Sequence, residues 1–400
     1  MIAERTDYSV PTELKSTLNG LFTKSLGVGL IGLVATVAGY FVLGPKEFFL
    51  SWLWAYIYII ALTVGPLAWV MLQFTTGGAW GVMIRRPAEA ASRTIWLTMV
   101  FFLPILAGAS YLYPWTNEAY VKSHEVVLHK AAYLNMTAWS IRAAVYLIGW
   151  AMLTLYYNKW SLREDAGDVR ARGKMTFVAG PGLIFHALAV TFMAVDWVMS
   201  QDPTWFSTMW GLLFIASQML TAMAFLITVM VLLREYSPIR EVLTQKHLHD
   251  MGKFCLALVM VWAYFSFSQF LIIWAANLPE EIPFYLRRMN HGWGYVGLML
   301  VFGHFALPFA LLLSRDLKRN FKLLRGIALF ILLMRFVDLF WLIKPFAYEN
   351  FHITWMDITA PVGMVGLWLA YFFTNLQQRP LIPANDPNLQ EALEHGRTSH

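Results

Sequence analysis

The chain has 400 residues, of which 58% are hydrophobic and only 14% are charged, and its mean hydropathy is +0.54. Soluble domains carry about 25% charged residues, so this composition excludes an ordinary soluble protein and indicates one that lies mostly in a membrane. The formal net charge of +6 alone would suit a nucleic-acid-binding protein, but the positions of the cations argue against that class.

Ten apolar stretches follow one another along the sequence, each long enough to cross a bilayer, which takes about 20 residues in a helix. They cover residues 25–43, 47–73, 93–113, 136–158, 176–199, 206–233, 254–276, 292–313, 325–345 and 355–374. The sequence therefore predicts an all-α, polytopic membrane protein with ten transmembrane helices.

The connections between these stretches predict how the chain is organised. Residues 1–24 form a polar N-terminal segment, 25–374 the ten-span membrane domain, and 375–400 a polar tail. Spans two to five, about 47–199, and spans six to nine, about 206–345, are expected to form two four-helix bundles. The first and tenth helices then lie outside them, and we expect the first helix to remain in place as an uncleaved anchor.

Lysine and arginine are distributed unequally between the two sides of the membrane. Of 30 such residues, 22 fall in the two terminal segments and in the connections after spans two, four, six and eight. Six fall in the other connections, and Arg142 and Arg335 lie inside spans. The positive-inside rule then predicts that both termini lie in the cytoplasm of a bacterial inner membrane.

The residues available for cofactor binding are few. Cys255 is the single cysteine, so the chain cannot build a disulfide, an iron–sulfur cluster or a thiolate metal site alone. His186 and His304 are the mid-span histidines, but they fall in different predicted bundles, which disfavours a shared haem. No phosphate-binding glycine-rich loop is present, which argues against an ATP-driven pump. We therefore expect no metal or redox cofactor in this chain.

In the first predicted bundle, Arg142 and Asp196 lie at similar depth, so an ion pair between spans four and five is geometrically possible. His186 lies ten residues before Asp196, about 15 Å deeper and about 80° around the helix. His186 and Asp196 are therefore expected to border one interior groove. The alternative is a purely structural ion pair beside a hydrogen-bonded histidine in the core.

The second predicted bundle is richer in polar groups. Ser268 and Gln269 come from span seven, His304 from span eight, and Arg335 and Asp338 share one face of span nine. Titratable groups beside hydroxyls and amides are what a water-supported proton path requires. The alternative is that these groups only hold helices together.

Glu280 and Glu281 follow span seven where it leaves the membrane. There the two carboxylates are able to meet water or a partner. We expect them to lie on the periplasmic side of the membrane.

Long stretches resemble a known family. Residues 196–211 read DWVMSQDPTWFSTMWG, 267–281 read FSQFLIIWAANLPEE, and 305–320 read FALPFALLLSRDLKRN. They resemble the ActF-type membrane subunits of Alternative Complex III, a bacterial quinol:cytochrome c or other acceptor oxidoreductase, which are related to the NrfD-like polysulfide-reductase subunits. Residues 77–94 (GGAWGVMIRRPAEAASRT) suit the cytoplasmic loop between spans two and three in this family.

The resemblance implies a non-catalytic subunit of a respiratory or photosynthetic electron-transport complex, which supports the assembly and carries protons. It also implies that Glu280 and Glu281 form an exit for protons or a docking surface for extrinsic subunits. Haem c and iron–sulfur clusters would lie on partner subunits, and quinol from the membrane pool would be oxidised at an ActC-like sister subunit. One alternative is that this chain binds quinol itself, using Arg142, Asp196, Asp202 or His291. Another is a stand-alone secondary transporter.

Overall fold

The computed structural model describes residues 8–78 and 80–397, and that part of the chain is built from helices without strands. The long helices are α1 (Thr12–Leu43), α2 (Pro45–Thr76), α3 (Trp80–Ser92), α4 (Ile95–Ala107), α8 (Met136–Asp165), α9 (Ala171–Trp197), α10 (Trp210–Leu233), α12 (Gln245–Ala276), α17 (Phe321–Ile343) and α18 (Met356–Gln377). One further long segment is made of α14 (Trp293–Met299), the π-helix η3 (Leu300–Ala306) and α15 (Leu307–Leu313).

Short helices lie at the two ends of the molecule. They are α5 (Ala109–Leu112), η1 (Pro114–Thr116), α6 (Glu118–Ser123), α7 (Glu125–His129), η2 (Met199–Gln201), α11 (Ile239–Val242), α13 (Pro283–Met289), α16 (Arg315–Arg319), η4 (Lys344–Phe346) and α19 (Leu389–Arg397).

Nine helical segments among the described residues are long and apolar enough to cross a membrane. The number becomes ten if α3 and α4, which meet at a bend of 43°, form one span. The prediction of an α-helical, multi-pass membrane protein is therefore confirmed. Whether the count is nine or ten depends on how the bent α3–α4 pair crosses the bilayer.

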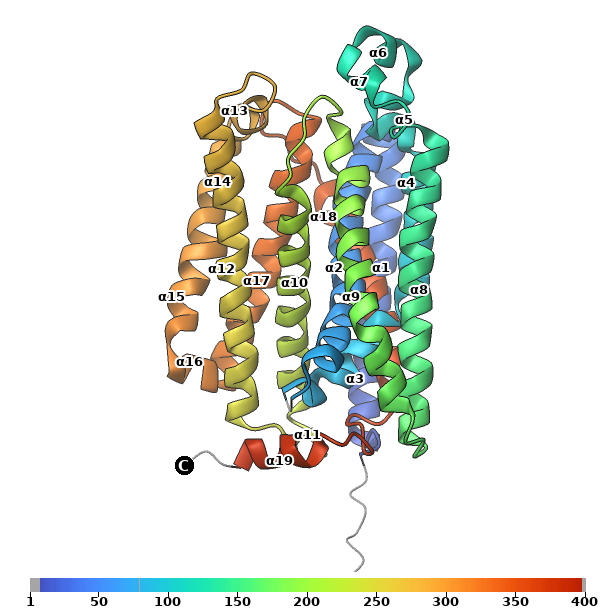
Figure 1. Cartoon of the computed structure of the whole chain (residues 1–400), viewed down its shortest axis with the longest axis vertical. Coiled ribbons are helices and arrows are strands. Elements are labelled where there is room, and N and C mark those ends of the chain that lie inside the picture. The colour runs from blue at the N-terminus through green and yellow to red at the C-terminus, as the bar shows by residue number, and fades with distance from the viewer. Residues whose placement is uncertain (1–7, 79, 398–400) are drawn as a thin grey trace, which may run out of the picture.

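Helix α2 lies inside the assembly (Figure 1), and 94% of its most apolar window is buried. It contacts α3, α4 and α9 on one side, and α10, α17 and α18 on the others. Helix α8 packs against α4 and α9, whereas α12 packs against α10 and α15. Helix α10 contacts α2 and α9 as well as α12 and α17, so it joins the two groups of helices.

Helices α1 and α18 pack together through glycine. A Cβ atom built on Gly32 would lie 2.6 Å from the backbone nitrogen of Gly363, and one on Gly29 would lie 2.6 Å from the nitrogen of Leu367. Glycines one turn apart on both helices thus let the two backbones touch, which is a common way for helices to associate in lipid. Much of the remaining surface of α1 is exposed and apolar.

Both ends of the described chain lie at the same end of the bundle, with α3, α11 and α19, whereas α5, α6, α7 and α13 lie at the other end (Figure 1). The backbone N–H of Leu381 also donates to the carbonyl of Tyr8 at 2.9 Å. The interpretation of 77–94 as a loop was wrong, because most of it forms the buried helix α3. Arg85 and Glu89 of this helix pair with one another inside the fold.

Candidate functional site

Arg142 from α8 and Asp196 from α9 form a bidentate ion pair. The guanidinium Nε and Nη2 atoms of Arg142 lie 2.9 and 2.8 Å from the two carboxylate oxygens of Asp196. Tyr146, one turn along α8, donates its hydroxyl to Asp196 Oδ2 at 2.7 Å, and the carbonyl of Tyr133 accepts from Arg142 Nη1 at 2.9 Å. The ion pair between spans four and five that the sequence made possible is therefore present.

The same arginine also stacks on an aromatic ring. Its guanidinium carbon lies 3.7 Å from the centroid of the Tyr133 ring. Burial and the neighbouring Asp196 carboxylate raise the pKa of the Tyr133 hydroxyl, which therefore stays protonated. Because its carboxylate accepts three hydrogen bonds, Asp196 has little capacity left for a further ligand.

His186 on α9 is buried, and both of its ring nitrogens are satisfied. The indole N–H of Trp150 lies 3.2 Å from Nδ1, and the side-chain amide of Gln218 lies 2.9 Å from Nε2. Since an indole nitrogen only donates, Nδ1 accepts from Trp150. The atom of Gln218 placed opposite Nε2 is the amide nitrogen, so a ring that carries its single proton on Nε2 is satisfied once the amide turns its oxygen towards that nitrogen. None of the described hydrogen bonds of His186 reaches Asp196.

Arg335 and Asp338 lie one turn apart on α17 and form an ion pair through Arg335 Nη1 and Asp338 Oδ2. Arg335 Nε donates to the hydroxyl of Thr221 on α10 at 3.3 Å. The indole of Trp262 on α12 donates to Asp338 Oδ2 at 3.3 Å. Both charged side chains are only 2% exposed. The pair predicted on one face of span nine is thus held between three helices.

His304 lies beside this pair in the π-helical segment η3 and is fully buried. Its ring centroid is 4.2 Å from that of Trp262, in an edge-to-face arrangement. Among the described residues, neither ring nitrogen of His304 has a hydrogen-bond partner. An unsatisfied buried polar group costs about 1–3 kcal/mol, and π-helical segments often mark functional positions. Among the residues predicted for the proton path, His304 is therefore the one whose position is hardest to explain by a role in helix packing alone.

Helix α10 contacts both sets of polar side chains, the one around His186 and the one around Arg335, which the sequence analysis treated separately. Gln218 contacts His186 in one group of helices, and Thr221, three residues later, contacts Arg335 in the other. The hydroxyl of Ser217, the neighbour of Gln218, is buried without a partner among the described residues. Sequence analysis missed these three residues because single hydroxyls and amides are common in membrane helices. The spacing of three to four residues from Ser217 and Gln218 to Thr221, which places them along one face of span six, could have indicated a polar face on this helix.

Gln269 extends the second group towards the end of the molecule that holds α13. It lies seven residues after Trp262 on α12, which places it on the same face and about 10 Å further along. Gln269 accepts from the Ser207 hydroxyl at 2.9 Å and contacts the Tyr285 hydroxyl at 3.4 Å. It also lines a cavity of about 70 Å³ together with Ser207 and Glu281. That volume is large enough to hold water.

The other residues of the predicted path lie around this cavity or outside it. Glu281 is half-buried, whereas Glu280 is exposed in the turn after α12. Ser268 is half-buried on α12 beside Gln269, and no hydrogen bond of its side chain is found among the described residues. Gln269 and Glu281 are thus brought together, but Ser268 is not brought into contact with Arg335 or Asp338.

The residues considered for quinol binding are dispersed. Asp202 pairs with Arg287 on α13 at 2.9 Å, and the Arg287 side chain is 38% exposed. His291 is half-exposed and lies 3.8 Å from the exposed Glu349. Arg142 and Asp196 are engaged with each other. These four residues do not converge on one pocket.

A buried ion cluster at the same end of the molecule was missed. Lys344 is fully buried, and its Nζ lies 3.1 Å from Glu47 Oε2 and 2.8 Å from Asp357 Oδ1. His352, which is 41% exposed, contacts Glu47 Oε1 at 3.0 Å. These residues sit at the ends of α2, α17 and α18, far apart in sequence. The sequence signal that could have indicated this cluster was the presence of ionisable residues at the ends of three spans on one side of the membrane.

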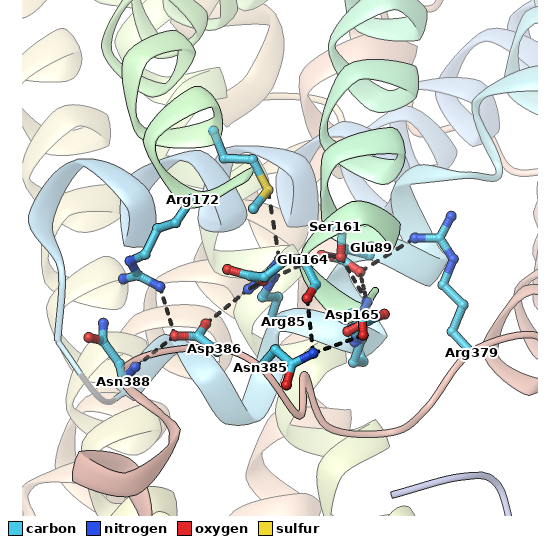
Figure 2. A network of polar contacts seen from close by, with 12 residues as sticks. Arg85, Glu89, Ser161, Glu164, Asp165, Arg172, Arg379, Asn385, Asp386 and Asn388 are labelled. Atoms are coloured by element: carbon cyan, nitrogen blue, oxygen red, sulfur yellow. Dashed lines mark hydrogen bonds and ion pairs between the residues drawn. The ribbon is translucent and has the colours of Figure 1, made fainter. Parts of the chain in front are cut away.

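A second missed cluster lies at the opposite end and is centred on Arg85 of α3 (Figure 2). Arg85 contacts Glu89 at 2.9 Å, Glu164 of α8 at 2.6 Å and Asp386 of the tail at 2.9 Å. Arg172 of α9 also contacts Asp386, at 2.7 Å. Both the Arg85 and the Asp386 side chains are fully buried.

The same network holds the C-terminal tail against the bundle. The amide of Asn385 donates to the backbone carbonyls of Glu164 and Asp165 at 3.1 and 2.8 Å (Figure 2). Arg379 lies 3.7 Å from Glu89, and burial lowers its pKa. Arg86 pairs with both Glu89 and Asp165. The cost of removing these charges from water offsets much of their mutual attraction, so the ion pairs alone are weak evidence for a more stable fold.

Within the described residues, no group of three or more histidine, cysteine, aspartate or glutamate side chains is arranged to hold a metal ion. No protein-family model matches the chain, and no curated protein matches it significantly.

Proposed function

We propose that this chain is an integral membrane subunit of a quinol:electron-acceptor oxidoreductase of the Alternative Complex III type. In this proposal it supports the complex and conducts protons, and it holds no redox cofactor of its own. Its partners are an ActC-like sister subunit and subunits that carry haem c and iron–sulfur clusters. The resemblance of residues 196–211, 267–281 and 305–320 supports the family, and the interior polar groups support the proton path.

One observation carries the proton path, namely that two sets of polar side chains lie along one face of α12, the first around Trp262 and the second around Gln269. Contacts join Thr221, Arg335, Asp338 and Trp262. His304 packs against Trp262, and its two ring nitrogens find no hydrogen-bond partner in the described part of the chain. Gln269 and its cavity lie about 10 Å further along the same face of α12, a gap that bound water can span. Protons would leave by way of Glu281.

The proposed architecture has ten spans, with α3 and α4 counted as one. Helices α2, α3–α4, α8 and α9 form the first four-helix bundle, and α10, α12, α14–α15 and α17 form the second. Helices α1 and α18 lie outside them. Contacts of α2 with α4 and α9, and of α10 with α12 and α17, support this division.

Both termini are proposed to lie in the cytoplasm. The unequal distribution of lysine and arginine supports this orientation. Cysteine labelling tests it: a cysteine placed at Thr204 should react from the periplasm, and one placed at Lys322 should not. The reverse pattern would overturn the orientation.

The proton path is tested with Asp338→Asn in the assembled complex, reconstituted in vesicles. We expect assembly and electron transfer to persist while the proton-to-electron ratio falls. The matched control is Asp316→Asn, because Asp316 is an exposed aspartate in α16. An unchanged ratio together with unchanged assembly would remove this cluster from the proposed path. Loss of assembly alone would make the pair structural.

Quinol binding remains a second candidate function, favoured by a cavity of about 290 Å³ near the end that holds α5. Its lining includes Tyr111, Gln201 and Lys46, so it combines apolar walls with hydrogen-bonding groups near one membrane face. The four residues first considered for quinol do not line this cavity. Quinol that co-purifies with wild-type chain but not with Gln201→Leu would favour this function.

A further inference from the structure

Helix α16 lies beside α12, at the end of the molecule where α19 lies (Figure 1). A cluster of basic side chains is formed where these two helices pack. His249 and Lys253 come from α12, and Lys318 and Arg319 come from α16. In the sequence these residues read only as part of the general excess of positive charge on one side. The structure brings them together from two segments that are separated by more than one span.

Lys318 shows that this cluster is built into the packing and is not simply displayed on the surface. Its side chain is only 6% exposed although it belongs to a short surface helix. A Cβ atom on Gly252 would lie 2.8 Å from Lys318 Cγ and 3.1 Å from Cδ. The lysine stem therefore lies across the backbone of α12, in a space that the glycine leaves open.

The cations in this cluster outnumber the carboxylates. Lys253 lies 3.0 Å from Asp250, and His249 approaches the same carboxylate at 4.0 Å. Within the described part of the chain, neither Lys318 nor Arg319 forms an ion pair, and Arg319 Nε is buried without a hydrogen-bond partner. Burial and the nearby charge of Lys253 lower the pKa of Lys318. The site thus has unmet capacity for an anion.

The surface beside the cluster is apolar. Leu313, the last residue of α15, is 57% exposed, and Leu323 in the first turn of α17 is 53% exposed. Leu311, two residues before Leu313 on α15, is 37% exposed. A ligand with an anionic head and aliphatic chains matches this arrangement, whereas a small inorganic anion would use only the polar half.

We propose that Lys253, Lys318 and Arg319 bind the phosphate group of an anionic phospholipid, whose acyl chains lie on the exposed leucines of α15 and α17. Basic pockets between membrane helices are suited to such headgroups. Each cation near the anionic headgroup strengthens the binding of the lipid, and the loss of two cations should weaken that binding about 30-fold.

The full chain is purified in phosphatidylcholine nanodiscs and titrated with phosphatidylglycerol. Native mass spectrometry then counts the phosphatidylglycerol molecules bound to the chain. Wild-type chain should retain phosphatidylglycerol selectively, and Lys318→Gln/Arg319→Gln should bind it about 30-fold more weakly. Thermal unfolding in phosphatidylcholine alone establishes that each variant is folded. The matched control is Lys159→Gln/Arg163→Gln, because both residues are exposed cations of α8 at the same end of the molecule.

A second variant tests the geometry without changing the charge. Gly252→Ala should displace Lys318 and weaken phosphatidylglycerol binding, even though every cation is still present. An equal loss of binding in the α8 control would show a general effect of positive charge and overturn the proposal. So would unchanged binding in the Lys318/Arg319 variant. Displacement of the lipid by inorganic phosphate at equal concentration would identify a free-phosphate site instead.

Discussion

The molecule holds two arginine–aspartate pairs inside its helices, and they are built differently. Arg142 and Asp196 join two helices through two hydrogen bonds, with Tyr146 and a backbone carbonyl satisfying the rest. Arg335 and Asp338 lie on one helix, and one carboxylate oxygen of Asp338 accepts from both Arg335 and the indole of Trp262. Next to the second pair lies His304, whose ring nitrogens have no partner among the described residues.

This difference decides what each pair can do. A pair between two helices forms only when the helices pack, so its energy contributes to tertiary stability. A pair within one helix already exists in the inserted but unpacked state, so it contributes less to packing. Fully satisfied networks hold one arrangement, whereas incompletely satisfied groups leave room for water and for proton movement. The first pair therefore suits a structural clamp and the second a functional site.

The largest effect is expected from Asp196→Asn, which leaves Arg142 without its counter-charge between α8 and α9. The free energy of unfolding should fall by about 3 kcal/mol, at the low end for a broken buried pair because Arg142 is 20% exposed. Denaturation in mixed micelles measures it. As a control, Asp202→Asn breaks the more exposed pair with Arg287 and should cost about 0–1 kcal/mol. If the two variants are equally stable, Arg142–Asp196 is not a clamp.

His186→Leu should have the next largest effect, because it leaves the indole of Trp150 and the amide of Gln218 without their shared partner. The expected loss of stability is about 1–3 kcal/mol. His291→Leu, at a half-exposed position, is the control and should change stability little. A His186→Leu variant as stable as wild type would mean that Trp150 and Gln218 find other partners, most simply water.

The sequence predicted the helices well because their length and apolar composition leave few alternatives in a bilayer. It also predicted that Arg335 and Asp338 share a face, since the spacing along one helix fixes that. It did not predict that α3 is buried. Arg85 and Glu89 resemble loop charges until the carboxylates of α8 and the tail are placed around them.

The same reason explains why sequence reasoning missed Gln218, Thr221 and the Lys344 cluster. Each becomes significant only through a partner more than a hundred residues away or on another helix, as for Thr221 with Arg335 and Lys344 with Glu47. Helical periodicity says which residues share a face, but it does not say which helix that face meets. For His304, mid-span depth was predicted, but the π-helical turn and the unpartnered ring were not.

Asp338→Asn should destabilise the chain less than Asp196→Asn, by about 1 kcal/mol, because its arginine lies on the same helix in both the packed and the unpacked state. Arg335 also keeps its contact with Thr221. The same mixed-micelle denaturation measures both variants side by side. A loss as large as that of Asp196→Asn would contradict the distinction drawn between the two pairs and would make the second a clamp as well.

The smallest effect on stability is expected from His304→Leu, although the residue is fully buried. Its ring has no hydrogen-bond partner within residues 8–78 and 80–397, so an apolar side chain would remove an unsatisfied polar group. Stability should therefore change by less than about 1 kcal/mol or should rise. Proton translocation by the assembled complex should nevertheless fall if His304 carries protons. His304→Gln keeps a polar side chain and serves as the matched variant. If His304→Leu instead costs as much as His186→Leu, the ring must have partners in the membrane-embedded protein and is part of the packing. If stability and proton translocation both stay at wild-type levels, His304 fills space beside Trp262, and the path must pass through Asp338 and water alone.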